Sequence, residues 1–242
     1  MYNSNIGTFP GKKLKGVERY KKLYHYTSFD SFVKIWLSKS LKFSPVSNVN
    51  DIQEKVIEAS IINPEQFALA KNYIAIRKSF KQVSFTMDYD SYLKGCMSPM
   101  MWGLYADKTK GVCIELDYDK IHFSANTLKD IVLYKPILKR YHGLDPQIKT
   151  EKDLRKFVLK QKKELFFTKH KCWAGENEFR VLNNKEEYLS IEGAINSIYI
   201  ASYENRDLIL NLVNRVVPLF LFTHDFALDN SAIPVLKEIK QE

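Results

Sequence analysis

The sequence has 242 residues, of which 45% are hydrophobic and 27% are charged. This apolar content is ample for a packed core and excludes a disordered, collagen-like or coiled-coil chain. The three cysteines, Cys96, Cys113 and Cys172, show no CxxC spacing, so neither a disulfide framework nor a zinc site is indicated. Free cysteines fit a reducing compartment, and we therefore expect a cytoplasmic protein.

No apolar run approaches 18 residues, so the sequence predicts no transmembrane helix and no membrane partner. The polar opening, MYNSNIGTFPGKKLKG, lacks the apolar core of a signal peptide. Phosphate-binding, dinucleotide-binding, α/β-hydrolase and zinc-peptidase motifs are also absent from the sequence. The sequence therefore does not favour a kinase, an α/β-hydrolase or a zinc peptidase.

The net charge of +9 is concentrated in two segments. Residues 1–22 form a basic leader with six Lys or Arg against one acid, and residues 149–171 carry nine against three. Apolar residues recur at helical spacing in the second segment, which predicts a basic helix at 150–166 with most of its cations outward. Such a face attracts nucleotides or nucleic acids. The alternative, a solvated surface, is the commoner role of a charge run.

In chain order, strands are expected at 23–27, 41–44, 83–87, 112–117, 131–134, 177–182, 197–201 and 216–222. Helices are expected at about 29–36, 64–81, 100–107, 150–166 and 204–215. Ser28 or Asp30 is expected to cap the first helix, and Pro45 to end the second strand. No linker or repeat divides the chain. We therefore predict an α+β fold, in which the basic leader precedes a single mixed domain at 23–242 with a central, largely antiparallel sheet flanked by helices.

The strongest local signal is WAGENEFR at 173–180. On a strand, Glu176, Glu178 and Arg180 would project to one face, because side chains alternate. Two neighbouring carboxyl groups raise the pKa of one of them, whereas a nearby arginine lowers a carboxyl pKa. Glu176 and Glu178 could therefore divide an acid role and an electrostatic role between them. A surface ion-pair ladder on a solvent-facing strand is the equally weighted alternative.

Two aromatic motifs accompany it. LYHYT at 23–27 places His25 and Thr27 on one strand face, with two tyrosines on the other. MMWGLYAD at 100–107 has apolar residues at helical spacing, which are core residues by default. A lone histidine is more often structural than a ligand, so His25 gains interest only if it meets the glutamates in space.

These motifs occur in an order similar to that of a bacterial family catalogued as domain of unknown function 2971. The matching segments are HYT at 25–27, FSP at 43–45, NDIQE at 50–54, MWGLYAD at 101–107, KGVCIE at 110–115 and WAGENEFR at 173–180. The resemblance covers about residues 23–202, and one departure is Ile52, where the family usually has proline. The family name implies no activity.

A more distant resemblance is to ADP-ribosyltransferases, which also have an opening His-Tyr-Thr strand and a late glutamate. It implies NAD as co-substrate and no metal. By position, His25 would contact the ribose, Glu178 would be the catalytic glutamate with Glu176 as the alternate, and Tyr26 or Tyr105 would stack on nicotinamide. The same resemblance assigns Thr27 and Arg180 to the cofactor site, and associates the chain with phage defence or toxin systems.

Two other functions remain open on the sequence alone. A non-catalytic nucleic-acid-binding module would use the basic helix, through Lys156, Lys160 and Lys163. A metal-dependent nuclease would gather four carboxylates around magnesium, namely Glu115, Asp117, Glu176 and Glu178. The sequence indicates no particular protein partner.

Overall fold

The computed structural model describes residues 21–46, 67–136, 148–214, 216–226 and 232–239. Most of the predicted basic leader and the NDIQE motif lie outside these ranges. Contacts group the chain into two units. Unit 1 comprises Met1–Leu41, Phe85–His122 and Ser190–Glu242, and unit 2 comprises Lys42–Ser84 and Phe123–Leu189.

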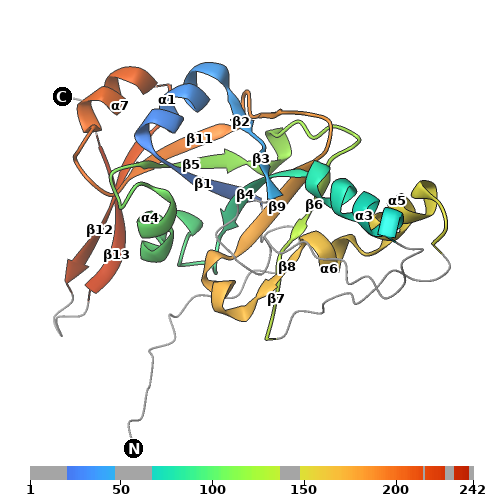
Figure 1. The fold of residues 1–242 in the computed structure, drawn as a ribbon. Coiled ribbons are helices and arrows are strands. Elements are labelled where there is room, and N and C mark those ends of the chain that lie inside the picture. Colours follow the sequence, from blue (N-terminus) through green and yellow to red (C-terminus); the bar gives the residue numbers. More distant parts are fainter. Residues whose placement is uncertain (1–20, 47–66, 137–147, 215, 227–231, 240–242) are drawn as a thin grey trace, which may run out of the picture. The chain divides into compact units, whose positions relative to one another are not determined.

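The largest sheet has nine strands in the order β13-β12-β11-β5-β1-β4-β9-β6, with β3 paired to β4 (Figure 1). Its strands are β1 (Lys22–Thr27), β3 (Ser44–Pro45), β4 (Lys81–Met87), β5 (Val112–Asp117), β6 (Leu128–Ile131), β9 (Glu178–Asn183), β11 (Ile195–Ile200), β12 (Leu219–Phe226) and β13 (Ala232–Glu238). Two short sheets pair β2 (Ser40–Lys42) with β10 (Tyr188–Ser190) and β7 (Leu133–Lys135) with β8 (Thr168–His170).

Most strand pairs in this sheet are antiparallel. They include β1 with β5, β5 with β11, β6 with β9, and β12 with β13. Strands β11 and β12 are parallel. The α-helices are α1 (Phe29–Ser38), α3 (Phe67–Ser79), α4 (Pro99–Tyr105), α5 (Glu151–Lys160), α6 (Lys162–Phe166) and α7 (Arg206–Val213). The predicted α+β class and largely antiparallel sheet are therefore confirmed.

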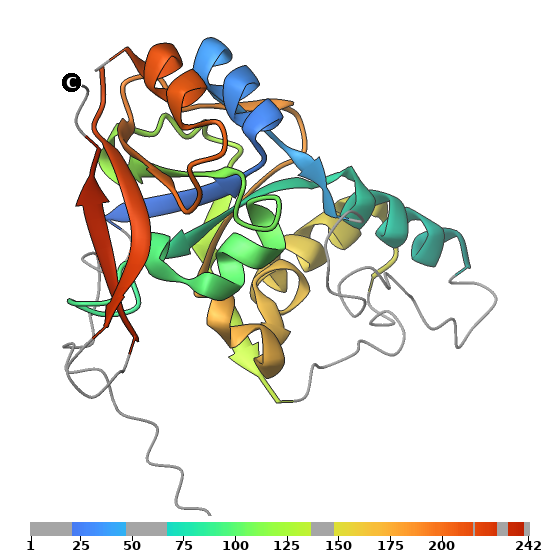
Figure 2. The ribbon, with the colours of Figure 1, turned by 90° about the vertical axis from the view of Figure 1, so that its left-hand side faces the viewer.

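In unit 1, helices α1 and α7 lie side by side over one face of the sheet, and α4 covers the other (Figures 1 and 2). The Ser28 side chain accepts a hydrogen bond from the Ser31 backbone and caps α1, as predicted. Ser98 caps α4 in the same way, and Pro99 occupies its first turn. Trp102 of α4 is buried, and its Nε1 donates to the Cys96 carbonyl at 2.8 Å.

A short 3-10 turn, η4 (Gly95–Met97), packs tightly on β1 beside α4. A methyl group at Gly95 would overlap the Tyr24 ring and lie 2.9 Å from the Met87 carbonyl oxygen, whereas one at Gly103 would meet nothing within 4 Å. We expect Gly95→Ala to lower the free energy of unfolding by about 1–3 kcal/mol through overpacking. Gly103→Ala, its control, should raise it by up to about 1 kcal/mol because alanine favours the helix. Urea denaturation measures both, and equal values would contradict the packing argument.

In unit 2, α3 and α5 pack together over a core that includes Tyr73, Leu154 and Val158. Thr150 and Asp153 form a capping box, which fixes the start of α5. The predicted basic helix is two helices, because α5 ends at Lys160 and α6 begins at Lys162.

The first five residues of β5 are all buried. Two points differ from the expectations drawn from the sequence. Pro45 lies within β3 rather than ending the preceding strand. β13 was not predicted at all. Within the described ranges, no helix combines the length and the apolar character that a membrane span requires.

Candidate functional site

The WAGENEFR segment does not form one strand. A 3-10 turn, η6 (Lys171–Glu176), contains Glu176, and β9 begins only at Glu178. Asn177 between them has a left-handed φ of 45°, a conformation that asparagine adopts more readily than most residues. The prediction that Glu176 shares a strand face with Glu178 and Arg180 is therefore wrong, although the three still come together.

Glu178 receives hydrogen bonds on both carboxylate oxygens. Its Oε1 accepts from Ser84 Oγ at 2.6 Å and from Arg180 Nε at 2.7 Å. Its Oε2 accepts from Arg180 Nη2 at 2.9 Å and lies 3.1 Å from Lys169 Nζ. A carboxylate has about four lone-pair sites, so these four donors fill its capacity. The Glu178 backbone N–H donates to the Tyr134 hydroxyl at 2.9 Å.

Lys169 joins the two glutamates. Its Nζ lies 2.5 Å from Glu176 Oε2, and the ammonium also sits 5.4 Å from the centre of the Trp173 ring. Arg180 is anchored on its other side, where Nη1 donates to the Phe166 carbonyl at 2.7 Å. We call Lys169, Glu176, Glu178 and Arg180 the ionic cluster. Its formal charges sum to zero, which is what burial of ionised groups requires.

The ionic cluster is buried, with exposures of 6% for Lys169, 3% for both glutamates and 2% for Arg180. The alternative of a surface ion-pair ladder is therefore wrong. Burial alone would raise the pKa of Glu178, but the charges of Arg180 and Lys169, with hydrogen bonds from Arg180 and Ser84, lower it to about 2. Glu178 is thus an ionised carboxylate across the physiological pH range, so it is suited to an electrostatic role rather than an acid role.

The other residues that the resemblance assigns to a cofactor site lie in unit 1, while the ionic cluster lies in unit 2. His25 is half-buried on β1, with its ring 5.9 Å from that of Phe85. Tyr26 is buried, its hydroxyl donates to the Gly95 carbonyl at 2.6 Å, and its ring meets Trp102 edge-on. Thr27 is buried and Tyr105 half-buried. A cofactor role for these four residues stays a prediction.

The carboxylates proposed for a nuclease have other partners. Glu115 accepts from the Tyr199 hydroxyl at 2.6 Å and pairs with Lys22 at 2.8 Å. Asp117 accepts from the Asp119 backbone and pairs with Lys120. In the part of the chain that the structure describes, no group of three or more His, Cys, Asp or Glu side chains is arranged to hold a metal ion.

Sequence reasoning missed Ser84, Tyr134 and Lys169. Lys169 was counted only as part of a basic segment, although it is buried on β8. Ser84 gave only a weak signal, as one of two small polar residues, with Thr86, in the predicted strand at 83–87. Tyr134 carried no local signal. In the folded chain, burial and then the nearby Glu178 charge raise its pKa, so its hydroxyl stays protonated beside the carboxylate.

The structure thus defines an α+β protein that holds an ionised, buried glutamate in unit 2. Residues 101–181 match the model of a family described as "Protein of unknown function (DUF2971)". The match contains the MWGLYAD, KGVCIE and WAGENEFR motifs and all four residues of the ionic cluster, and it ends within β9 at residue 181. No curated protein and no solved structure matches the chain.

Proposed function

We propose that this chain is an NAD-dependent ADP-ribosyltransferase-like enzyme, in which Glu178 stabilises positive charge that develops on the ribose. The observation that carries the proposal is the state of Glu178, which is buried, ionised and fixed by donors on both oxygens. The motif order and the late-strand glutamate supply the link to NAD, through the resemblance to that superfamily.

The proposed chemistry needs a fixed anion and no proton donor. When the bond between nicotinamide and ribose breaks, its electron pair leaves with nicotinamide, which departs as a neutral molecule. The sugar then carries positive charge, as in glycoside hydrolysis. Glu178 would interact more strongly with this charge than with the ground state, and such an interaction lowers the barrier. The acceptor closes the reaction by attacking the sugar carbon and losing its proton.

The donor set of Glu178 offers a way for a substrate hydroxyl to bind. Because all four lone-pair sites are filled, a ribose hydroxyl has to replace one donor. Ser84 is the only uncharged donor of the four, so its replacement by another hydroxyl would leave the charge balance of the ionic cluster unchanged. Lys169 and Arg180 would continue to hold the carboxylate in place.

Glu176 would act on the acceptor. It precedes Glu178 by two residues, a spacing that in the resembling transferases accompanies activation of the acceptor nucleophile. Lys169 holds Glu176 at 2.5 Å and contacts Glu178 as well, so the lysine would set the distance between the two carboxylates.

The test is release of nicotinamide from NAD by the purified chain, with water as acceptor, measured by chromatography. We expect Glu178→Gln to reduce the rate by at least about 100-fold, the usual cost of removing a preorganised electrostatic group. Glu178→Asp keeps the charge but moves it, and should lose most of the activity while remaining folded. Glu115→Gln is the matched control, since Glu115 is equally buried and is also held by a lysine and a hydroxyl.

Wild-type activity in the Glu115 variant and loss in both Glu178 variants would support the proposal. Unchanged nicotinamide release by a folded Glu178→Gln variant would refute it. So would a wild-type chain that neither releases nicotinamide nor binds NAD in a calorimetric titration.

A further inference from the structure

Helix α5 of unit 2 carries three exposed lysines in a row. Lys152, Lys156 and Lys160 are spaced four residues apart, so they follow one another on the same side of the helix. We call these residues the lysine stripe. At a rise of about 1.5 Å per residue, their backbone positions are about 6 Å apart and span about 12 Å.

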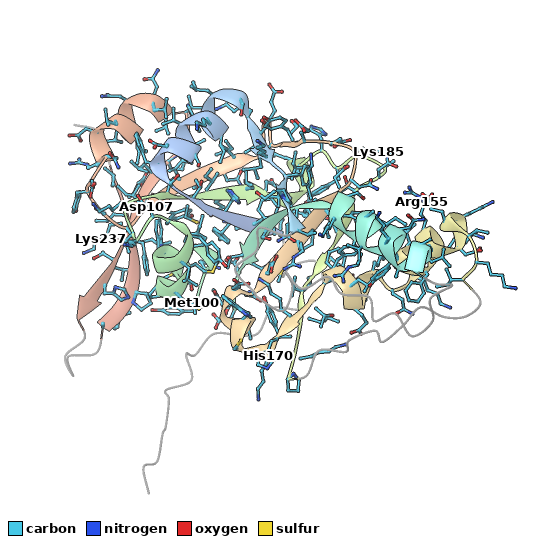
Figure 3. All side chains as sticks on the ribbon, viewed as in Figure 1. Met100, Asp107, Arg155, His170, Lys185 and Lys237 are labelled. Atoms are coloured by element: carbon cyan, nitrogen blue, oxygen red, sulfur yellow. The ribbon has the colours of Figure 1, made fainter. Side chains whose placement is uncertain are left out.

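The opposite side of α5 fixes the lysine stripe in space. Leu154 and Val158 are buried in the unit 2 core, and Phe157 packs against the same core. The capping box of Thr150 and Asp153 holds the first turn, with the Asp153 backbone donating to Thr150 Oγ1 at 3.2 Å. The stripe is therefore displayed by an anchored helix, whose side chains extend outward around Arg155 (Figure 3).

Two neighbouring cations form ion pairs, whereas no ion pair is formed by a lysine of the stripe with a described residue. Arg155 pairs with Glu151 at 2.7 Å, and Lys163 pairs with Asp130 at 3.3 Å. Among the residues with described positions, no acid forms an ion pair with any of the three stripe lysines. Lys163, predicted from the sequence to contact nucleic acid, is thus less suited to that role than Lys152.

We propose that the lysine stripe binds the phosphate backbone of a nucleic acid duplex. Asp153 lies close enough to Lys156 for its carboxylate to feel that charge, but no lysine of the stripe forms an ion pair with a described residue. Closely spaced phosphates along one strand are the partner that such a linear row of exposed cations fits. A lysine ammonium is a point charge without the planar fork that reads base edges, so this binding would be independent of sequence. The proposal does not rest on the NAD activity, because the stripe would bind without NAD.

Two other anionic partners fit this surface less well. A membrane-surface helix inserts an apolar face among the lipids, but the apolar face of α5 is packed into the core and only Leu159 is exposed beside the stripe. Single-strand binding depends on aromatic side chains that stack on bases, and Phe157, the one aromatic residue of α5, packs against the core.

The experiment measures binding of the full chain to short fluorescein-labelled DNA and RNA duplexes of mixed sequence by anisotropy. Three phosphate contacts give a slope of about −2.7 in log affinity against log salt, or about a 40-fold loss from 50 to 200 mM. We expect the wild type to show at least this salt dependence. The variant K152Q/K156Q/K160Q should bind at least about 10-fold more weakly and have a slope shallower by about 2.7.

The matched control is K34Q/K108Q/K185Q, which removes the same charge from three exposed lysines on different elements. It should keep the wild-type slope. All substituted lysines are exposed, and circular dichroism will verify that each variant is folded. The proposal is overturned if the stripe variant and the wild type bind duplexes equally, or if both triple variants weaken binding to the same extent. Stripe-dependent binding to phosphatidylserine vesicles without duplex binding would assign the surface to membranes instead.

Discussion

Replacing Arg180 with methionine is expected to lower the free energy of unfolding by about 3–5 kcal/mol, the usual cost of removing one partner from a buried ion pair. Arg180 contributes two hydrogen bonds to Glu178 and one to the Phe166 carbonyl, and only 2% of the residue is exposed. Its loss would leave two buried glutamates with one lysine, an excess negative charge with little access to water. Urea denaturation followed by circular dichroism measures the change.

Two comparisons make this expectation specific. Arg155→Met removes an exposed arginine from an ion pair within α5, and should cost about 0.3–0.5 kcal/mol. The double variant E178Q/R180M removes one anion and one cation, leaving Lys169 paired with Glu176. It should therefore be more stable than Arg180→Met alone. A cost for Arg180→Met no larger than that for Arg155→Met would show that the ionic cluster contributes little to folding.

Acid should destabilise the wild type more steeply than the Glu178→Gln variant. The pKa of Glu178 falls from an ordinary 4.5 to about 2 on folding, so unfolded chains bind more protons between these values. A depressed carboxyl pKa contributes stability that is complete above about pH 4.5 and is lost as the pH falls through about 2. At 1.36 kcal/mol per pKa unit, this contribution is about 3 kcal/mol.

The measurement is the slope of unfolding free energy against pH between about 5 and 2.5, for wild type and Glu178→Gln. Glutamine at 178 does not titrate. The slope for the Glu178→Gln variant should therefore be smaller than that of the wild type, by up to the amount that one additional proton bound by the unfolded chain produces. The comparison of slopes is independent of any constant destabilisation that the substitution itself causes. Identical slopes would mean that Glu178 has a similar pKa in the folded and unfolded chains.

Local sequence signals predicted the helices that begin with a clear cap. Ser28 before an apolar stripe indicated α1, and apolar residues at helical spacing after Pro99 indicated α4, because capping and periodicity act within one or two turns. β1 and β4 were also predicted nearly to the residue, since alternation and β-branched or aromatic content agree there. These elements are specified by neighbours in the sequence.

The ionic cluster depended on partners distant in sequence. Ser84 reaches Glu178 across 94 positions, and Tyr134 reaches it across 44. No periodicity in the sequence encodes such pairings. The buried position of β9 was missed for a related reason. A strand that reads Glu-Phe-Arg-Val looks half-exposed, but Glu178 and Arg180 neutralise each other and can both be buried.

Each unit is assembled from separate stretches of chain. The polypeptide passes between the units at four places, after residues 41, 84, 122 and 189. No contiguous fragment of the chain therefore contains one whole unit without part of the other, and the family-matched stretch at 101–181 includes pieces of both. A cut or an early stop codon at residue 122 would leave each unit without some of its strands. Neither unit can therefore be expressed alone as an uninterrupted fragment, because residues 85–122 of unit 1 lie between the two stretches of unit 2.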